Sequence, residues 1–343
     1  MSKKCYAHLF RHDAERMTGA LTPPWNNDKD KHLFLLPFYH CYGFGKHIEI
    51  FQESIRFVPV VPPIMVFLAK SPICQRYDLS SLQFLLSGAA PAGKDLCEEL
   101  SRKYKNMTHI QQGYGMSEVS MASHLPDIVD GQPFGSVGKL ASNLEMKIVN
   151  PENHMERKRG EVGEICIRGP TVMLGYINKP KETSECIKDG WMHTGDLGYV
   201  DNKGYLFIVD RLKELIKVKG FQVTSNFLYE NELEMKMKMK MLQVPPAELE
   251  NILLCHPLIQ DVAVIGIPDA DTGEAPKAYV VRSSNDLTEE EVKLFVKGLP
   301  LFLDKVSPYK QLSGGVEFVK EIPKSPSGKI LRRLLRERSH SKL

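Results

Sequence analysis

Apolar runs that end at turns of small residues organise the first part of the chain. Residues 33–36 form such a run, and Pro37 stops it because proline cannot donate a hydrogen bond to a sheet. A second apolar strand is predicted at residues 84–86, with the small-residue turn 87–91 after it and a helix over about 92–105. Strand, turn and helix in alternation are typical of α/β construction.

The pattern changes near residue 135, where shorter β-like segments are separated by glycines. These segments predict a β subdomain over about residues 135–210. The expected strands lie at residues 145–149, 164–168 and 205–209, and a turn at residues 202–204 comes before the last of them.

The chain becomes basic after Asp210 and Arg211, which predicts a second unit from there to residue 343. Thr288 and Glu291 have the spacing of a capping box, which opens a helix that ends near residue 298. The other expected elements are helices at 245–254 and 330–337 and strands at 261–267, 277–282 and 316–319. The expected fold class is α/β: a large domain over residues 1–210 that carries the β subdomain, and a small, mobile α+β domain over residues 211–343.

The segment 223–243 does not fit this organisation. Residues 235–241 alternate Met and Lys, a period that suits a strand, but their long side chains give that strand little to pack. Removing residues 223–243 joins Gly220-Phe221-Gln222 to Val244-Pro245-Pro246 as one continuous motif. We interpret the segment as an insert, which a retained intron would explain, and expect a disordered loop if it is translated.

Composition narrows the class of protein. A chain of 343 residues with 42% hydrophobic and 25% charged residues can form two domains with sizeable cores. A net charge of +3 is too small to favour nucleic acid or an anionic membrane as a partner. The longest apolar run, residues 57–69, contains three prolines and is too short to span a bilayer. Seven scattered cysteines without a Cys-x-x-Cys pair argue against a disulfide framework and against a zinc site.

The last three residues carry an address signal. Ser341, Lys342 and Leu343 form the complete tripeptide that the peroxisomal import receptor reads. The sequence therefore predicts a peroxisomal protein with that receptor as a partner.

The stretch 111–118, Gln-Gln-Gly-Tyr-Gly-Met-Ser-Glu, carries the most chemical information. Glycines on both sides of Tyr114 would let its ring and the backbone lie flat against a planar base. The hydroxyl of Ser117 and the carboxylate of Glu118 follow closely, where they could meet a phosphate and its magnesium ion. Alone, the stretch is equally well explained as a tight turn with an exposed tyrosine.

Four other stretches change that balance, and each has a structural explanation when taken singly. They are the turn 87–91, the stretch 191–196 that ends in Asp196, the charged link 210–217, and the Pro/Ser/Gly loop 323–329 that ends in Lys329. Asp196 follows a glycine turn, so its carboxylate could accept both hydroxyls of a ribose. Together, the five stretches favour a nucleotide site over unrelated caps, turns and loops. We interpret His193, beside this turn, as structural.

In this order, the five stretches resemble those of the adenylate-forming superfamily of acyl-CoA synthetases, luciferases and nonribosomal adenylation domains. Residues 36–43, 60–64 and 84–91 sharpen the resemblance to the branch of 4-coumarate–CoA ligases and luciferases, and it covers nearly the whole chain outside 223–243. The resemblance implies that a carboxylate and MgATP form an acyl adenylate and pyrophosphate. The C-terminal domain then swings, and the acyl group passes to the thiol of coenzyme A.

The resemblance also implies a role for individual residues. Lys329 would stabilise the transition state at the α-phosphate, and His40 and Lys217 would also act in catalysis. The residues implied to bind the nucleotide are Ser87, Gly88, Ala89, Ala90, Pro91, Gln111, Gly113, Tyr114, Gly115, Ser117, Asp196 and Arg211. The remaining implied roles are magnesium for Glu118, coenzyme A for Lys219 and Gly220, the acyl pocket for His40 and Tyr42, and the hinge for Lys213.

The chain departs from the family pattern upstream. The Ser/Thr/Gly-rich phosphate loop of the family, which should precede residue 36, is absent, so Met1 is expected to fall inside the large domain. The backbone donors that cradle the β- and γ-phosphates would be missing with it. Ser117 stands where the family more often has threonine, which keeps the hydroxyl.

Three functions remain open at this level. The first is a peroxisomal acyl- or aryl-CoA ligase, the second a non-catalytic remnant that binds nucleotide or coenzyme A, and the third a luciferase-like monooxygenase. The acyl substrate is equally open among aromatic propenoates and medium-chain or long-chain fatty acids. ATP or AMP, Mg²⁺ and coenzyme A are the ligands that the resemblance implies.

Overall fold

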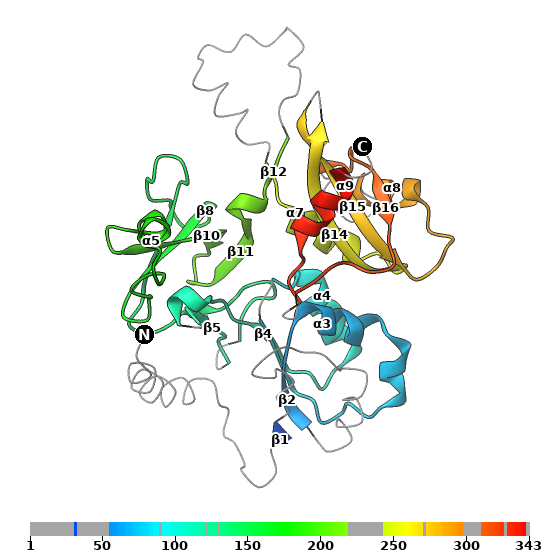
Figure 1. Cartoon of the computed structure of the whole chain (residues 1–343). Coiled ribbons are helices and arrows are strands. Elements are labelled where there is room, and N and C mark those ends of the chain that lie inside the picture. Colours follow the sequence, from blue (N-terminus) through cyan, green and yellow to red (C-terminus); the bar gives the residue numbers. More distant parts are fainter. Residues whose placement is uncertain are drawn as a thin grey trace. The chain divides into compact units, whose positions relative to one another are not determined.

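The computed structural model divides the chain into two compact units (Figure 1). The first contains residues 1–208 and 326–328, and the second contains residues 209–325 and 329–343. The structure describes residues 31–32, 55–88, 91–120, 122–128, 131–218, 243–269, 272–297, 310–325 and 328–340. The division between Ile208 and Val209 lies beside the boundary predicted at Asp210. Within the described ranges, every helix is too short or too polar to cross a membrane.

A parallel sheet forms the start of the first unit. Its order is β1 (Lys31–His32), β2 (Ile55–Val60), β3 (Phe84–Ser87) and β4 (His109–Gln112), with each neighbouring pair parallel. Helix α3 (Pro62–Lys70) follows β2, and helix α4 (Lys94–Lys103) follows β3. Prolines at the first two positions suit the start of α3, where their missing N–H groups have no helical partner. The predicted strand 84–86 and helix 92–105 are confirmed, whereas residues 33–36 lie outside the described residues.

One apolar core joins this sheet to its helices. Met65 and Leu68 of α3, Leu100 of α4 and Leu85 of β3 belong to the same buried cluster. Helices α3 and α4 also contact each other. The α/β class predicted from alternating strands and helices is therefore present in the first unit.

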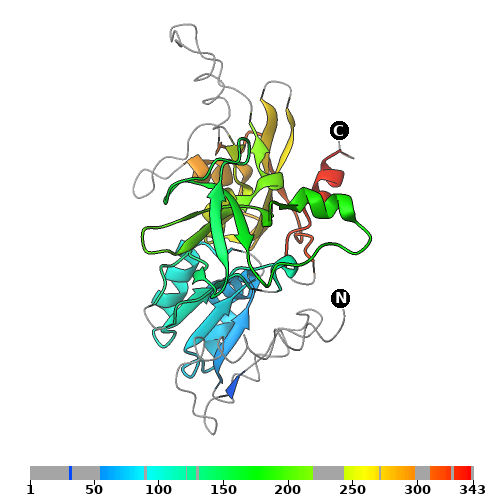
Figure 2. The same cartoon turned by 90° about the vertical axis from the view of Figure 1, so that its left-hand side faces the viewer.

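The predicted β subdomain is an antiparallel sheet with the order β11-β10-β8-β7 (Figures 1 and 2). Its strands are β7 (Glu145–Val149), β8 (Gly163–Arg168), β9 (Ile187–Lys188), β10 (Trp191–Val200) and β11 (Leu206–Arg211), with β9 paired to β10. The first unit also contains a short antiparallel pair, β5 (His124–Leu125) and β6 (Lys139–Leu140), and helix α5 (Pro180–Cys186). The turn predicted at residues 194–196 lies inside β10, where the register shifts between His193 and Leu197.

The second unit packs helices on a three-stranded sheet. Strands β14 (Ile259–Asp269) and β15 (Gly273–Arg282) form a long hairpin, and β16 (Val316–Phe318) runs parallel to β15 (Figure 2). The helices are α7 (Pro246–Leu254), α8 (Glu289–Lys297) and α9 (Arg332–His340). At α8, the Oγ1 of Thr288 accepts the N–H of Glu291 at 3.3 Å and the carboxylate of Glu291 accepts the N–H of Thr288 at 2.8 Å. The predicted capping box is confirmed.

The end of the proposed insert needs a correction. Gln243, which we assigned to the insert, lies in β13 (Gln243–Val244), which pairs with β12 (Ile216–Lys217). Gln222-Val223 and Gln243-Val244 repeat the same two residues, so the sequence alone allows either junction. Gln243 therefore lies in a strand, and not in the disordered loop that we expected for the whole insert. Residues 219–242 lie outside the described residues.

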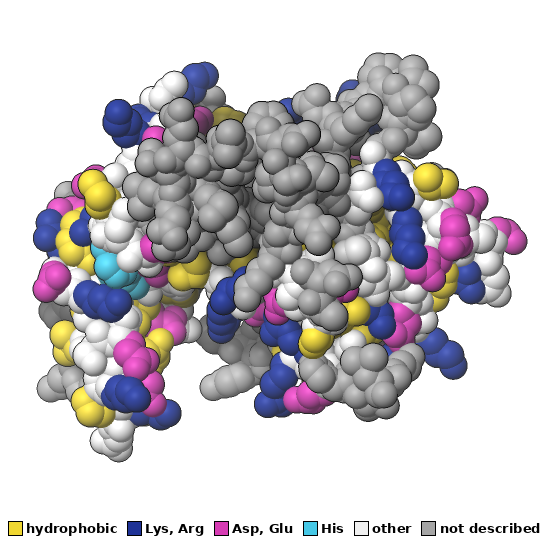
Figure 3. All heavy atoms as spheres, turned by 90° about the horizontal axis from the view of Figure 1, so that it is seen from above, with side chains coloured by type: hydrophobic (Ala, Val, Ile, Leu, Met, Phe, Trp, Pro, Cys, Tyr) yellow, Lys and Arg dark blue, Asp and Glu magenta, His cyan; other side chains and the backbone are white. Residues whose placement is uncertain are grey.

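Charges of both signs are mixed on the face of the molecule drawn in Figure 3, where Lys and Arg stand among Asp and Glu. One ion pair, by contrast, is buried in the second unit. Arg332 donates to both carboxylate oxygens of Glu250, at 2.7 and 2.8 Å, and the N–H of Val264 donates to the same carboxylate at 2.8 Å. Burial raises the pKa of Glu250 to about 7, although the charge of Arg332 opposes the shift. The pair ties α7, α9 and β14 together.

Replacing Arg332 with Met is expected to lower the free energy of unfolding of the second unit by about 3 kcal/mol, because Glu250 would lose its charged partner and would have to take up a proton to stay buried. Urea unfolding of the full chain, followed by amide hydrogen exchange in β14, measures the loss. Arg333→Met on the same helix is the control, since Arg333 is 84% exposed. Equal losses in both variants would contradict the assignment.

Candidate nucleotide site

Two turns of the first unit lie side by side at the carboxyl ends of parallel strands. Ser87 ends β3 and pairs with Gln112 at the end of β4. The N–H of Gly113 donates to the carbonyl of Ser87 at 3.2 Å, and the N–H of Gly88 donates to Val60 at 3.2 Å. A Cβ placed on Gly88 would meet no atom within 4 Å, so the backbone is open there. In α/β sheets, ligands bind at this edge.

Tyr114 stands directly after this edge and is held at both its backbone and its ring. Its N–H and carbonyl exchange hydrogen bonds with His124, at 3.2 and 3.0 Å. Its hydroxyl donates to the Oδ2 of Asp196 at 2.6 Å. Two residues predicted for the nucleotide, 82 positions apart, are therefore in direct contact.

The carboxylate of Asp196 is buried, and an irregular turn within β10 presents it. Gly195 adopts φ +71°, a conformation that glycine reaches without strain. The hydroxyl of Thr194 accepts the N–H of Asp196 at 3.1 Å and donates to the carbonyl of Ile165 at 2.8 Å. Strand β8 therefore fixes the turn through Thr194.

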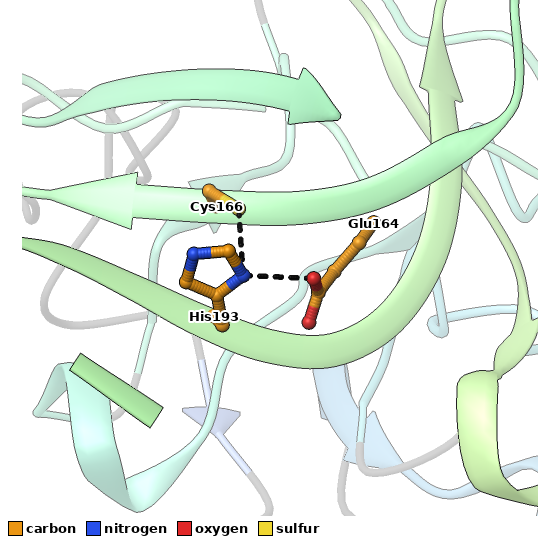
Figure 4. Close-up of side chains that lie close together, drawn as sticks. All are labelled: Glu164, Cys166 and His193. Carbon is orange, nitrogen blue, oxygen red and sulfur yellow. Dashed lines mark hydrogen bonds and ion pairs between the residues drawn. The ribbon is translucent and has the colours of Figure 1, made fainter. Parts of the chain in front are cut away.

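Glu164 of β8 supports the same turn, although it was not among the residues predicted from the sequence. Its Oε1 accepts the N–H of Gly195 at 3.2 Å, and its Oε2 contacts the Nδ1 of His193 at 2.8 Å (Figure 4). The Sγ of Cys166 lies 3.5 Å from the same nitrogen. Burial, with a smaller effect of the Glu164 charge, raises the pKa of the Cys166 thiol to about 12. The sequence feature that could have identified Glu164 is its carboxylate inside an otherwise apolar strand.

Ser117 and Glu118 begin a single 3₁₀ turn, Ser117–Val119. Ser117 is exposed, as a residue that meets a phosphate must be. The Oε1 of Glu118 accepts the hydroxyl of Tyr176 at 2.8 Å. Burial raises the pKa of Tyr176 to about 12, and the carboxylate of Glu118 adds to the shift. A cation at Glu118 would share the carboxylate with this phenol.

Buried polar atoms without a partner mark the same region. Within the described part of the chain, the Oγ of Ser87 and the Nε2 of His124 are buried and accept or donate no hydrogen bond. Burial lowers the pKa of His124 to about 3, so the ring is neutral. The side chain of Gln112 is satisfied instead, because it bonds both the N–H and the carbonyl of Ala92, at 2.7 and 2.9 Å. Gln111, also predicted for the nucleotide, donates to the carbonyl of Asp127 at 2.7 Å.

Pro91 and Gly115, also predicted for the nucleotide, are exposed in the first unit. The remaining predicted residues that the structure describes belong to the second unit. Arg211, Lys213 and Lys217 are exposed there, and the N–H of Lys217 donates to Glu274 at 2.7 Å. Lys329 is also exposed, and its N–H donates to the Oγ of Ser325 at 3.1 Å. The predicted positions His40, Tyr42, Ala89, Ala90, Lys219, Gly220, Ser341, Lys342 and Leu343 lie outside the described residues.

Comparison with protein families agrees with this geometry. The AMP-binding enzyme model matches residues 45–177, and the AMP-binding enzyme C-terminal domain model matches residues 248–329. The chain belongs to the adenylate-forming family of AMP-binding enzymes. Its fold is the family fold: ATP-bound MatB from Rhodopseudomonas palustris, 28% identical, superimposes with a TM-score of 0.70 over 87% of this chain and 53% of that one.

Within the family, the chain is similar to 4-coumarate–CoA ligases. The 4-coumarate:CoA ligase 1 of Petunia hybrida is 41% identical over 354 residues, which cover 95% of this chain and 60% of the relative. The probable 4-coumarate–CoA ligase 3 of Dictyostelium discoideum is 40% identical over 99% of this chain and 61% of the relative. The chain thus spans about 60% of the length of these relatives. The branch predicted from residues 36–43, 60–64 and 84–91 is confirmed.

Proposed function

We propose that the protein is an ATP-dependent acid–thiol ligase that converts a carboxylic acid to its acyl adenylate and then to its coenzyme A thioester. The contact between Tyr114 and Asp196 carries the proposal. It sets an aromatic face and a carboxylate side by side at the edge of the sheet where α/β proteins bind ligands. An aromatic ring can stack on adenine and a carboxylate can accept hydrogen bonds from ribose hydroxyls, so the pair suits a nucleoside.

The residues present suit a nucleotide. Tyr114 would stack on adenine, and Asp196 would accept the ribose hydroxyls. A ribose-binding role for Arg211 is proposed on family likeness alone. The Oγ of Ser87 is buried without a partner, and a ligand at this edge would supply one. Next to Ser87, the backbone of Gly88 has free space around it, so a ligand could approach closely.

The remaining roles are proposed on family likeness. Glu118 would hold Mg²⁺, and its bond to Tyr176 orients the carboxylate. Lys329 would act at the α-phosphate, while Lys217, Lys219 and Gly220 would serve thioester formation. Lys213 would be the hinge, and His40 and Tyr42 would border the acyl pocket.

The proposed substrate is an aromatic propenoate or a fatty acid. The relatives are named for 4-coumarate, which supports the aromatic class and a place in phenylpropanoid metabolism. Fatty acids share the carboxylate on which adenylation acts, so fatty acid metabolism is the second candidate.

Pyrophosphate exchange tests the activity. The full chain, with MgATP and labelled pyrophosphate, is expected to form labelled ATP only when a carboxylic acid is present. Cinnamate-type acids and fatty acids of graded length form the panel, and alkane alcohols of equal length are the control. If no acid of the panel supports exchange and the chain still binds AMP, the protein binds a nucleotide but is not a ligase.

We also propose that the protein is peroxisomal, because it ends in Ser341-Lys342-Leu343. A fluorescent protein fused to the N-terminus is expected to enter peroxisomes, and removal of the last three residues is expected to leave it in the cytosol. Import of both forms would show that the tripeptide is not the signal.

A further inference from the structure

Glu164, Cys166 and His193 converge from two neighbouring strands of the first unit (Figure 4). Glu164 and Cys166 are two positions apart on β8, so their side chains share one face of the sheet. His193 pairs directly with Cys166 across β8 and β10. One potential ligand atom of each residue lies within 4.8 Å of the other two.

The two separations from the Nδ1 of His193 are close to those of a metal site, and the third lies within 4.8 Å. Zinc bonds of about 2.0–2.3 Å place tetrahedral ligand atoms roughly 3.3–3.7 Å apart. The Nδ1 of His193 and the Sγ of Cys166 are already 3.5 Å apart. The Nδ1 and the Oε2 of Glu164, at 2.8 Å, are at hydrogen-bond distance and would have to separate by about half an ångström.

We propose that Glu164, Cys166 and His193 bind a divalent cation of the zinc class, with water in the fourth position. The donor set selects this class, because thiolate and imidazole suit zinc, whereas magnesium and calcium prefer oxygen ligands throughout. The site is separate from the magnesium site proposed at Glu118. It does not depend on the proposed ligase activity.

The cation would replace the hydrogen bond between His193 and Glu164, and its charge would balance that of its ligands. The Glu164 carboxylate and a Cys166 thiolate supply two negative charges against the two positive charges of the ion, while His193 stays neutral. The thiol proton passes to solvent, and the remaining imidazole proton sits on Nε2. Coordination through the Oε2 of Glu164 leaves its Oε1 on the N–H of Gly195. The ion would therefore stiffen the turn that presents Asp196.

The cluster borders the surface, which gives an ion a route of entry. The side chains of His193 and Glu164 are 12% and 8% exposed. The ring of the exposed His154 meets the ring of His193 edge-on, with 5.6 Å between their centroids. The sequence argued against zinc because it contains no Cys-x-x-Cys pair, but this donor set combines a Glu-x-Cys pair with a histidine 27 positions later.

Titration of the full chain with Co²⁺, a spectroscopic substitute for zinc, tests the proposal. We expect a saturable thiolate-to-cobalt absorption at one equivalent, reversed by Zn²⁺ and removed by a chelator. Cys166→Ser is expected to abolish this absorption and to weaken Zn²⁺ binding by about 100-fold. Cys255→Ser, which changes an exposed thiol, is the matched control and should retain the signal.

His193→Gln gives a second readout, because glutamine can keep a hydrogen bond to Glu164 but lacks the imidazole ligand. It is expected to weaken Zn²⁺ binding while circular dichroism shows an unchanged fold. If Cys166→Ser does not fold, the proposal is tested with His193→Gln alone. Absence of the thiolate absorption in the wild-type chain, or the same signal in both ligand variants, would overturn the proposal. The three side chains would then be a hydrogen-bonded network only.

Discussion

Asp196→Asn is expected to weaken the binding of AMP by about 100-fold, because the amide replaces one acceptor oxygen with a donor and the remaining oxygen no longer carries a charge. Isothermal titration of the full chain with AMP measures the affinity. Tyr114→Phe should cause a smaller loss, since the ring remains while the bond to Asp196 disappears. Because both variants keep the aromatic ring, the difference between them separates the effect of the Asp196 carboxylate from that of the hydroxyl that contacts it.

The control for Asp196→Asn is Asp189→Asn. Asp189 is exposed and has φ +49°, a backbone conformation that asparagine tolerates. Its AMP affinity should match that of the wild-type chain. Wild-type affinity in Asp196→Asn, with the fold intact by circular dichroism, would remove Asp196 from the nucleotide site.

Lys329→Ala is expected to slow carboxylate-dependent pyrophosphate exchange by about 1000-fold and to leave AMP affinity nearly unchanged. A positive charge that meets the reacting phosphate acts most strongly in the transition state, so its loss lowers the rate rather than the affinity. Pre-steady-state exchange and AMP titration on the same protein separate the two effects.

The fold around Lys329 should survive the substitution. The side chain is exposed, and the contacts that close the loop to Ser325 come from the backbone of Lys329. Lys320→Ala, an exposed lysine of the same unit, is the control for loss of charge and should keep the wild-type rate. Equal rates for the two variants would refute the role of Lys329.

Local pattern was sufficient for most elements. Apolar runs predicted β3, β7, β8 and β14, and the spacing of Thr288 and Glu291 predicted the start of α8. These features are encoded within a few neighbouring residues, so one sequence can show them. The tyrosine between two glycines and the aspartate after a glycine turn were visible for the same reason.

Contacts between distant segments were not visible. The extent of β10 was missed because a glycine inside a strand looks like a turn until its neighbours pair with β8. His124 is buried where it pairs with Tyr114, and this pairing could not be predicted from either residue alone. The strand at Gln243 depends on its pairing with Lys217, a residue 26 positions earlier in the chain.

The α/β class, the order of the motifs and the residues that carry the candidate chemistry could be predicted from the sequence, because they depend on residue type and local spacing. The tertiary structure alone decided that Tyr114 contacts Asp196 and that Glu164, Cys166 and His193 share one face of a sheet. The second result comes from the strand register between β8 and β10. A shift of one residue would have turned the same side chains to the opposite face.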